Sequence, residues 1–251
     1  MNKFFSIITP THNRSFFLKK NIESIQKQKL VGVDFDYEHI IVDNNSTDDT
    51  EKIVQEIAKL DPRIIYIKND RNIGPADALN IGFKKSVGKY IIPADDDDLF
   101  PMSSLKFRYD FMSQNSQIDW SYGYSIFIDE NDCLWKDLLE YNIKFYDLDH
   151  NDSDLVFEKL FERCFISGGT VTIKRECIEK VGGWDISRKT QDFDMWLRLA
   201  NENFRLARIN SYLYYYRVHP NMSSKIHKKE NIYSEEQRFY LEKYKNRIKN
   251  K

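Results

Sequence analysis

Apolar and polar positions alternate in blocks along the first hundred residues. Four continuous apolar runs rich in Ile, Phe, Val and Tyr are typical of buried strands. These runs cover residues 4–9, 37–43, 63–68 and 89–94. Between them, apolar side chains recur at helical spacing over residues 15–28, 47–60 and 75–86. This alternation predicts right-handed βαβ units, an α/β fold and a mostly parallel central sheet flanked by helices.

Local signals refine two of the helix starts. Ser46 with Asp49 resembles a capping box in front of the helix 47–60. Pro75 suits the first turn of the helix 75–86.

The pattern becomes less regular after residue 101. We expect a helix at 103–113, a strand or hairpin at 118–129 and a helix at 190–202. Three further short strands are expected at 170–174, 204–209 and 213–218. Residues 130–165 have no clear period, and their acidic and aromatic content suits a region that fits a particular substrate.

Composition excludes several classes of protein. A formal net charge of −1 gives no basic field for nucleic acid. Three irregularly spaced cysteines suit neither a disulfide framework nor a CxxC metal site, so buried free thiols in a reducing compartment are expected. The sequence has neither a signal-peptide pattern nor the roughly 20-residue apolar run of a membrane span. We therefore expect a cytoplasmic location.

Polar loops follow the predicted strands. Ligands of parallel α/β sheets bind beyond the carboxyl ends of the strands. That rule brings together residues 9–14, 43–46, 69–77 and 95–98. Each of them alone could be a solvated loop, but their coincidence at one sheet edge indicates a binding site.

Four consecutive carboxylates, Asp95 to Asp98, form the last of these loops. Two carboxylates about 4 Å apart repel each other by roughly 4 kcal/mol at an effective dielectric constant of about 20. Held at a strand end, the run requires a cation or shifted pKa values. The alternative is an acidic helix N-terminus.

Familiar nucleotide and calcium motifs are missing. The sequence contains no GxGxxG, GxxxxGK[ST] or GxSxG. Residues 43–54 superficially resemble a calcium loop, but Asp48 stands where glycine is needed and Val54 where glutamate is needed. A divalent metal that bridges carboxylates and a diphosphate could then recognise the phosphates.

Six segments in order carry a resemblance to a known family. They are SIITPTHNR (6–14), IIVDNNSTDDT (40–50), NDRNIGPADALNIGFKKSVGKYI (69–91), ADDDDLFP (94–101), TQDFDMWLRLA (190–200) and YYYRVHPNMSS (214–224). Over roughly residues 4–220 the chain resembles family 2 of the glycosyltransferases, which have the A-type, nucleotide-diphospho-sugar-binding fold. Two positions depart from the family pattern. Gln191 replaces a common Glu, and Leu79 replaces a common Arg whose contact to the donor Arg71 or Arg14 could supply.

The resemblance implies a single Rossmann-like domain over residues 1–224. Its first hundred residues would bind the nucleotide sugar, and residues 101–224 would bind the acceptor. Asp43 would accept hydrogen bonds from the uracil or ribose, unless it only closes an Asx turn. The full set of implied donor-binding residues is Thr9, Pro10, Thr11, Arg14, Asp43, Asn72, Gly74, Asp77, Asp95 and Asp96.

The resemblance implies a divalent metal, Mn²⁺ or Mg²⁺, at the acidic run. It leaves open which of the four aspartates bind the metal. Asp97 is the first choice as a direct ligand, with Asp95 toward the ribose or a metal-bound water. His219 could approach the metal or the diphosphate. Asp98 is the expected bystander.

Asp192 is the implied general base, which takes the proton of the acceptor hydroxyl. Asp194 lies two residues further, about 200° around a helix, so the two carboxylates cannot share a face. Trp196 could form the floor of the sugar site, with Gly168 and Gly169 also on the acceptor side.

The resemblance therefore implies an inverting glycosyltransferase. Its donor would be a nucleotide sugar, most simply a UDP-sugar, and its acceptor a bacterial surface glycan or a lipid-linked glycan. Two alternatives stay open: a sugar-1-phosphate nucleotidyltransferase, and an inactive nucleotide-sugar or glycan-binding module.

The tail over residues 225–251 is basic, with nine Lys or Arg against four Glu. Leu241, Tyr244 and Ile248 recur at helical spacing, with Tyr240 beside them. Such a helix could dock peripherally on the inner face of an anionic membrane. The alternative is a terminal helix packed on its own domain or on a second subunit of a homodimer.

Overall fold

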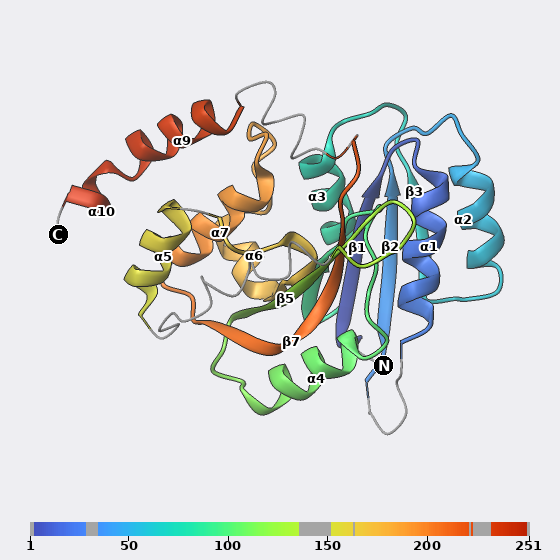
Figure 1. Cartoon of the computed structure of the whole chain (residues 1–251), viewed down its shortest axis with the longest axis horizontal. Helices are drawn as coiled ribbons and strands as arrows, with labels where there is room; N and C mark the ends of the chain where they lie inside the picture. Colours follow the sequence, from blue (N-terminus) through green and yellow to red (C-terminus); the bar gives the residue numbers. More distant parts are fainter. Residues whose placement is uncertain are drawn as a thin grey trace.

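The structure, a computed structural model, describes residues 3–28, 35–135, 152–162, 164–220, 222 and 232–249. It is one α/β domain with a seven-stranded sheet in the order β3-β2-β1-β4-β6-β5-β7 (Figure 1). The strands are β1 Phe5–Thr11, β2 Tyr37–Asp43, β3 Ile64–Lys68, β4 Tyr90–Pro93, β5 Trp120–Ile128, β6 Thr172–Lys174 and β7 Leu206–Arg217. The helices are α1 Ser15–Gln26, α2 Thr50–Ala58, α3 Pro75–Lys85, α4 Ser104–Gln114, α5 Ser153–Glu162, α6 Arg175–Val181, α7 Gln191–Asn201, α9 Ile232–Lys243 and α10 Lys245–Lys249.

The predicted mostly parallel sheet is confirmed. Strands β1 to β4 pair in parallel, and β5 pairs in parallel with β7. Only β6, between β4 and β5, is antiparallel to its neighbours among the described strands. Strand β2 is buried on both faces, so its adjacent residues pack against helices on opposite sides of the sheet. Ile41 packs with α1 and α2, whereas Ile40 packs on the α3 side.

The glycine pattern of α3 has a packing reason. A Cβ on Gly82 would lie 2.4 Å from Cγ2 of Ile8, so only glycine lets α3 approach β1 this closely. Gly74 precedes the helix with a φ of 84°, a backbone conformation that favours glycine. Pro75 opens α3 as predicted.

Several local predictions are wrong. The capping box of Ser46 and Asp49 does not form, and α2 starts at Thr50 without a side-chain cap. Asp48 accepts hydrogen bonds from the amide and hydroxyl of Thr50 instead. The two strands expected at 204–209 and 213–218 are one continuous strand, β7. Its pairing with β5 shifts register twice, and this lets one long strand follow its twisted partner.

The cysteines and the variable region also differ from expectation. Cys133 and Cys164 are exposed, and only Cys177 of the three is buried. The expectation of buried thiols is therefore wrong for two positions. Residues 136–151, in the middle of the segment 130–165 that was expected to fit the substrate, lie outside the described residues.

Within its described residues, the basic tail packs on its own domain. Tyr240 and Tyr244 of the expected apolar stripe are buried in the same core cluster as α5 and α7, while Leu241 is exposed. Arg247 donates hydrogen bonds to the carbonyl of Asn201 and to Asp154. No helix among the described residues is long and apolar enough to cross a membrane.

Candidate active site

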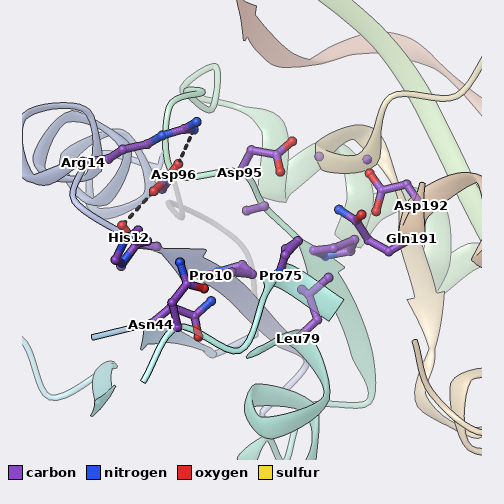
Figure 2. Close-up of a pocket in the computed structure, with 16 residues that line it drawn as sticks. Pro10, His12, Arg14, Asn44, Pro75, Leu79, Asp95, Asp96, Gln191 and Asp192 are labelled. Atoms are coloured by element: carbon purple, nitrogen blue, oxygen red, sulfur yellow. Dashed lines mark hydrogen bonds and ion pairs between the residues drawn. The ribbon is translucent and has the colours of Figure 1, made fainter. Parts of the chain in front are cut away.

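A cavity of about 260 Å³ opens beyond the carboxyl ends of β1 and β4. The chain order reverses between these two strands, which is where doubly wound sheets bind ligands. Nine predicted site residues line this cavity: Pro10, Thr11, Arg14, Asn72, Asp95, Asp96, Gly168, Gly169 and Asp192 (Figure 2).

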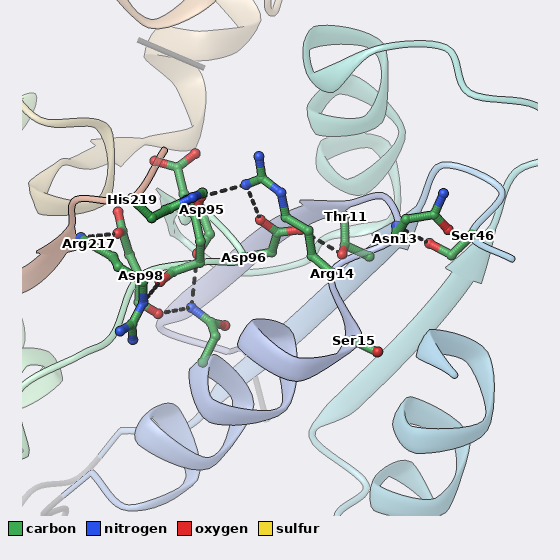
Figure 3. A network of polar contacts seen from close by, with 12 residues as sticks. Thr11, Asn13, Arg14, Ser15, Ser46, Asp95, Asp96, Asp98, Arg217 and His219 are labelled. Carbon is green, nitrogen blue, oxygen red and sulfur yellow. Dashed lines mark hydrogen bonds and ion pairs between the residues drawn. The ribbon is translucent and has the colours of Figure 1, made fainter. Parts of the chain in front are cut away.

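Hydrogen bonds from two residues distant in sequence, Asn21 and Arg217, hold the backbone of the acidic run 95–98. The Asn21 amide of α1 donates to the carbonyls of Asp95, at 3.0 Å, and Asp98, at 2.9 Å. The fully buried Arg217 donates from Nε to the carbonyl of Asp97 at 2.6 Å, and its own amide donates to the Asp98 carboxylate (Figure 3). These contacts fix the loop, so each carboxylate has its own environment.

Three of the four carboxylates are already paired. Asp96 accepts a hydrogen bond from the Thr11 hydroxyl at 2.7 Å and from Arg14 at 3.0 Å. Asp97 contacts Arg14 at 2.5 Å and His219 at 2.9 Å through the same oxygen, Oδ2. By contrast, the carboxylate of Asp95 accepts no hydrogen bond from any described residue, and it points into the cavity (Figure 2).

The pKa values of these carboxyl groups diverge. Burial, followed by the charge of Asp97, raises the pKa of Asp96 to about 6. The pKa of Asp95 is raised well above its ordinary value, because surrounding protein removes water and because Asp192 and Asp97 carry like charges. Burial also opposes the ionisation of Asp97, but the hydrogen bond from His219 and the charge of Arg14 outweigh it, so that pKa is lowered. Such divergence is typical of functional sites.

Asp192 faces Asp95 across the cavity (Figure 2). It lies in the first turn of α7, and its Oδ2 would be 2.4 Å from a Cβ on Gly168, so the glycine makes room for the carboxylate. Burial raises the pKa of Asp192 to about 6. At neutral pH the group is therefore ionised but readily protonated, as a general base must be.

The predicted separation of Asp192 from Asp194 is confirmed. Asp194 is fully buried on the opposite side of α7 and accepts a hydrogen bond from Arg198 at 2.6 Å. Trp196 is fully buried as well, stacked on Trp120 with ring centroids 5.7 Å apart. Trp196 therefore does not line the cavity, and the expectation that it forms a sugar floor is wrong.

The glycine turn beneath Asp192 is held by a buried arginine. Gly168–Thr170 form a 3-10 turn, and Arg108 of α4 donates to the carbonyls of Gly169, at 2.6 Å, and Val171, at 2.8 Å. Burial without a facing carboxylate lowers the pKa of Arg108 to about 9. This residue supports the site, and its place in the middle of a predicted helix gave no signal of that role.

Asp43 lies behind the cavity rather than in it. It is fully buried, and its two oxygens accept hydrogen bonds from the Ser46 amide at 2.8 Å and the Tyr66 hydroxyl at 2.6 Å. The first contact is the Asx-type turn that was the alternative to nucleotide binding. The turn carries Asn44 into the cavity wall.

Other predicted residues also lie outside the cavity lining. Thr9 is buried against His39 at 2.9 Å. Gly74 accepts a hydrogen bond from Asn44 through its carbonyl, and Asp77 follows in the first turn of α3. Asp97 and His219 pair with each other behind Asp95, and the His219 ring lies 5.4 Å from that of Phe17. The donor and metal roles of these residues stay predictions.

Seven lining residues were not among the predicted site residues: His12, Asn44, Pro75, Leu79, Pro93, Ala94 and Gln191. His12 and Asn44 lie in two of the polar loops that the sequence analysis expected at the binding edge. Their position in these loops was the signal that could have identified them. Pro93 is the last residue of β4, and Ala94 follows it. The apolar pattern of this segment predicts burial but gives no sign of a binding role.

The donor set suits a hard divalent cation. Among the described residues, no group of three or more His, Cys, Asp or Glu side chains forms a metal site. Mg²⁺ and similar ions, however, are commonly held by one or two carboxylates together with substrate phosphates. The open oxygens of Asp95 fit that arrangement. In Asp97, by contrast, Arg14 and His219 already contact Oδ2.

Comparison with known proteins agrees with this geometry. The model of the family described as "Glycosyl transferase family 2" matches residues 6–182. The chain belongs to this family. The uncharacterized glycosyltransferase MJ1057 of Methanocaldococcus jannaschii is 29% identical over 91% of this chain and 76% of its own length.

A second relative of this glycosyltransferase is the Escherichia coli UDP-Glc:alpha-D-GlcNAc-diphosphoundecaprenol beta-1,3-glucosyltransferase WfaP. It is 26% identical over 85% of this chain and 77% of its own length. Family membership makes the nucleotidyltransferase alternative wrong.

Solved structures share the A-type fold. S. aureus TarS 1-349 in complex with UDP-GlcNAc superposes with a TM-score of 0.67 at 18% identity, over 88% of this chain and 60% of that one. The mannosyltransferase PcManGT from Pyrobaculum calidifontis, in complex with GDP-Man and Mn²⁺, gives a TM-score of 0.65 at 17% identity. It covers 88% of this chain and 59% of its own. The glycosyltransferase thus spans about three fifths of these two neighbours.

Proposed function

We propose that the glycosyltransferase moves a hexose from a UDP-sugar to a hydroxyl of a surface glycan or lipid-linked glycan, with inversion at the anomeric carbon. The observation that carries this proposal is the pair of carboxylates, Asp95 and Asp192, that face each other across the cavity. The UDP-GlcNAc bound to TarS and the UDP-Glc and diphosphoundecaprenol substrates in the name of WfaP support the donor and acceptor classes.

The donor would enter along the ends of β1 and β2. Pro10, His12, Asn44 and Asn72 line that part of the cavity and offer flat and amide surfaces for a nucleoside. Arg14, with contacts to Asp96 and Asp97, also lines the cavity and is placed to donate to the diphosphate. Its guanidinium would supply the basic contact that Leu79 lacks.

When bound at Asp95 and the diphosphate, Mn²⁺ or Mg²⁺ would neutralise charge on the leaving group. The Mn²⁺ complex of PcManGT supports this choice of ion. On the opposite wall, Asp192 would accept the proton of the acceptor hydroxyl as that oxygen attacks the anomeric carbon. With base and leaving group on opposite sides of the sugar, a single displacement inverts the configuration.

The glycine turn would shape the acceptor side. Gly168 and Gly169 line the cavity beside Asp192 and carry no side chain to exclude an incoming hydroxyl. Residues 101–224 supply this wall, so we place the acceptor there.

The test is UDP release from a panel of UDP-sugars, with Mn²⁺ or Mg²⁺, by wild type and by Asp192→Asn. Mass-balanced transfer to lipid-linked acceptor glycans identifies the acceptor. We expect divalent-dependent UDP release that Asp192→Asn loses. Nucleotide binding without any turnover, across donors and acceptors, would instead support an inactive binding module.

A further inference from the structure

The C-terminal helix α9 contacts the start of α7, the helix that carries Asp192. Thr190 is the N-cap residue of α7, and its carbonyl accepts a hydrogen bond from the Asp194 amide at 3.0 Å. An N-cap hydroxyl ordinarily accepts a bond from an amide of the first turn, but Thr190 makes no such bond. Its hydroxyl donates instead to Oε2 of Glu236 on α9, at 3.0 Å and 46 residues away.

Glu236 is buried, with 8% of its surface exposed, and polar and cationic side chains surround its carboxylate. Nη1 of Arg188 lies 3.5 Å from Oε1, and the Tyr240 hydroxyl donates to Oε2 at 3.3 Å. The Arg188 guanidinium also lies over the ring of Phe239, 3.9 Å from its centroid. A buried carboxylate is costly unless it is paired in this way, so these contacts define one arrangement of residues 188–190.

Helix α9 also contacts the residues of α7 that follow Asp192 in sequence. The Tyr240 ring packs edge-on against Phe193, with centroids 5.2 Å apart. Nζ of Lys243 lies 3.6 Å from Oδ1 of Asp194. Residues 188, 190, 193 and 194 are therefore all held by α9, while Asp192 between them points into the cavity.

We propose that Glu236 is a positioning residue for Asp192, acting through Thr190 and Arg188. Because the Thr190 hydroxyl bonds to Glu236 and makes no cap hydrogen bond to α7, the direction of the first turn of α7 depends on the contact with α9. A carboxylate displaced by about 1 Å can cost roughly 10²-fold in rate. The inference rests on the proposed role of Asp192 as the base.

The test compares Glu236→Ala with Glu235→Ala, whose exposed side chain lies next to Glu236 on the same helix. UDP release is measured with UDP-glucose and UDP-GlcNAc in the presence of Mn²⁺, and UDP affinity is measured by calorimetry. We expect Glu236→Ala to lower kcat by about 10- to 10²-fold. UDP affinity should stay unchanged, and Glu235→Ala should behave like wild type. Glu236→Gln keeps an acceptor for Thr190 but loses the ion pair with Arg188, so its kcat should be intermediate.

A double variant separates positioning from a general loss of structure. In an Asp192→Asn background, Glu236→Ala should cause no further loss of rate, because there is no base left to position. Equal activity of Glu236→Ala and Glu235→Ala, or a full additive loss in the double variant, would overturn the proposal. Wild-type rates in Asp192→Asn would overturn the proposed function instead, so the two failures can be told apart.

Amide hydrogen exchange gives a readout that does not need turnover. Glu236→Ala should speed exchange in the first turn of α7, about 10-fold at residues 193–195, and leave the strands β1 and β4 unchanged. Unchanged exchange in that turn contradicts the proposal, even if neither donor is turned over.

Discussion

His219 lies 2.9 Å from the carboxylate of Asp97, although 122 residues separate the two in sequence. Arg14 contacts the same oxygen at 2.5 Å. Arg14 and His219 therefore both contact Oδ2 of Asp97, the residue that the sequence analysis favours as the direct metal ligand. The neighbouring Asp95 presents its oxygens to the cavity without such a partner among the described residues.

This contrast predicts different effects of Asp95→Asn and Asp97→Asn. Asp95→Asn should weaken Mn²⁺ binding in the presence of UDP by about 10-fold or more, because it removes the open carboxylate. Asp97→Asn should mainly lower the free energy of unfolding, on the order of 3 kcal/mol, because Arg14 and His219 lose a largely buried ionised partner. Electron paramagnetic resonance of Mn²⁺ and thermal unfolding measure the two effects. Stronger loss of Mn²⁺ in Asp97→Asn would return the ligand role to Asp97.

Asp192→Asn should separate chemistry from binding. The amide keeps the shape of the side chain but cannot take a proton, so kcat should fall by about 10² to 10⁴-fold. UDP affinity, measured by calorimetry, should remain close to that of wild type. Loss of UDP binding in a well-folded variant would make Asp192 a donor ligand instead.

The raised pKa of Asp192 predicts a pH dependence of stability. Its pKa in the folded chain is about 6, above the ordinary value of 3.8, so folding favours the protonated form. The stability this group contributes is fully present below about pH 4 and is lost as the pH rises through about 6. Asp192→Asn should therefore raise the Tm at about pH 7.5, and the difference should vanish near pH 4. A variant less stable than wild type at neutral pH would contradict this.

The same pKa sets the pH profile of the reaction. A general base must be deprotonated, so kcat/KM should fall as the pH drops below about 6. Steady-state UDP release between pH 5 and 8 measures this limb. A rate independent of pH over that range would argue against Asp192 as the base.

Gly168→Ala should move the carboxylate without unfolding the protein. The added methyl group would lie 2.4 Å from Oδ2 of Asp192, which is too close, and the flexible side chain must rotate away. We expect kcat to fall by about 10-fold or more at an unchanged Tm. Ser167→Ala, one residue earlier, is the control. Gly169→Ala should instead destabilise the fold, because its methyl group would lie 1.9 Å from the Tyr214 ring.

The elements of the sheet could be predicted because they depend on neighbours in sequence. Apolar runs and helical spacing located β1 to β4 and α1 to α3, and the loops after those strands form much of the cavity. The misses after residue 101 have a different cause. Strand β7 is continuous only because it pairs with β5, and no local pattern encodes that pairing.

Among the residues of the motif at 190–200, too, local geometry could be predicted from the sequence and long-range contacts could not. The spacing of Asp192 and Asp194 was enough to place them on opposite sides of α7, since helix geometry is local. The same motif could not reveal that Trp196 stacks on Trp120, whose strand lies far away in sequence.

The sequence by itself thus determined the α/β sheet, the edge at which its polar loops meet and the separation of Asp192 from Asp194 on different faces of α7. Only the tertiary structure decided which carboxylate of the acidic run stays open, because the partners of Asp96 and Asp97 come from Thr11, Arg14 and His219. It also decided that the tail packs against α7. Periodicity reports which face of an element is buried, whereas the partner of a charged side chain depends on long-range packing.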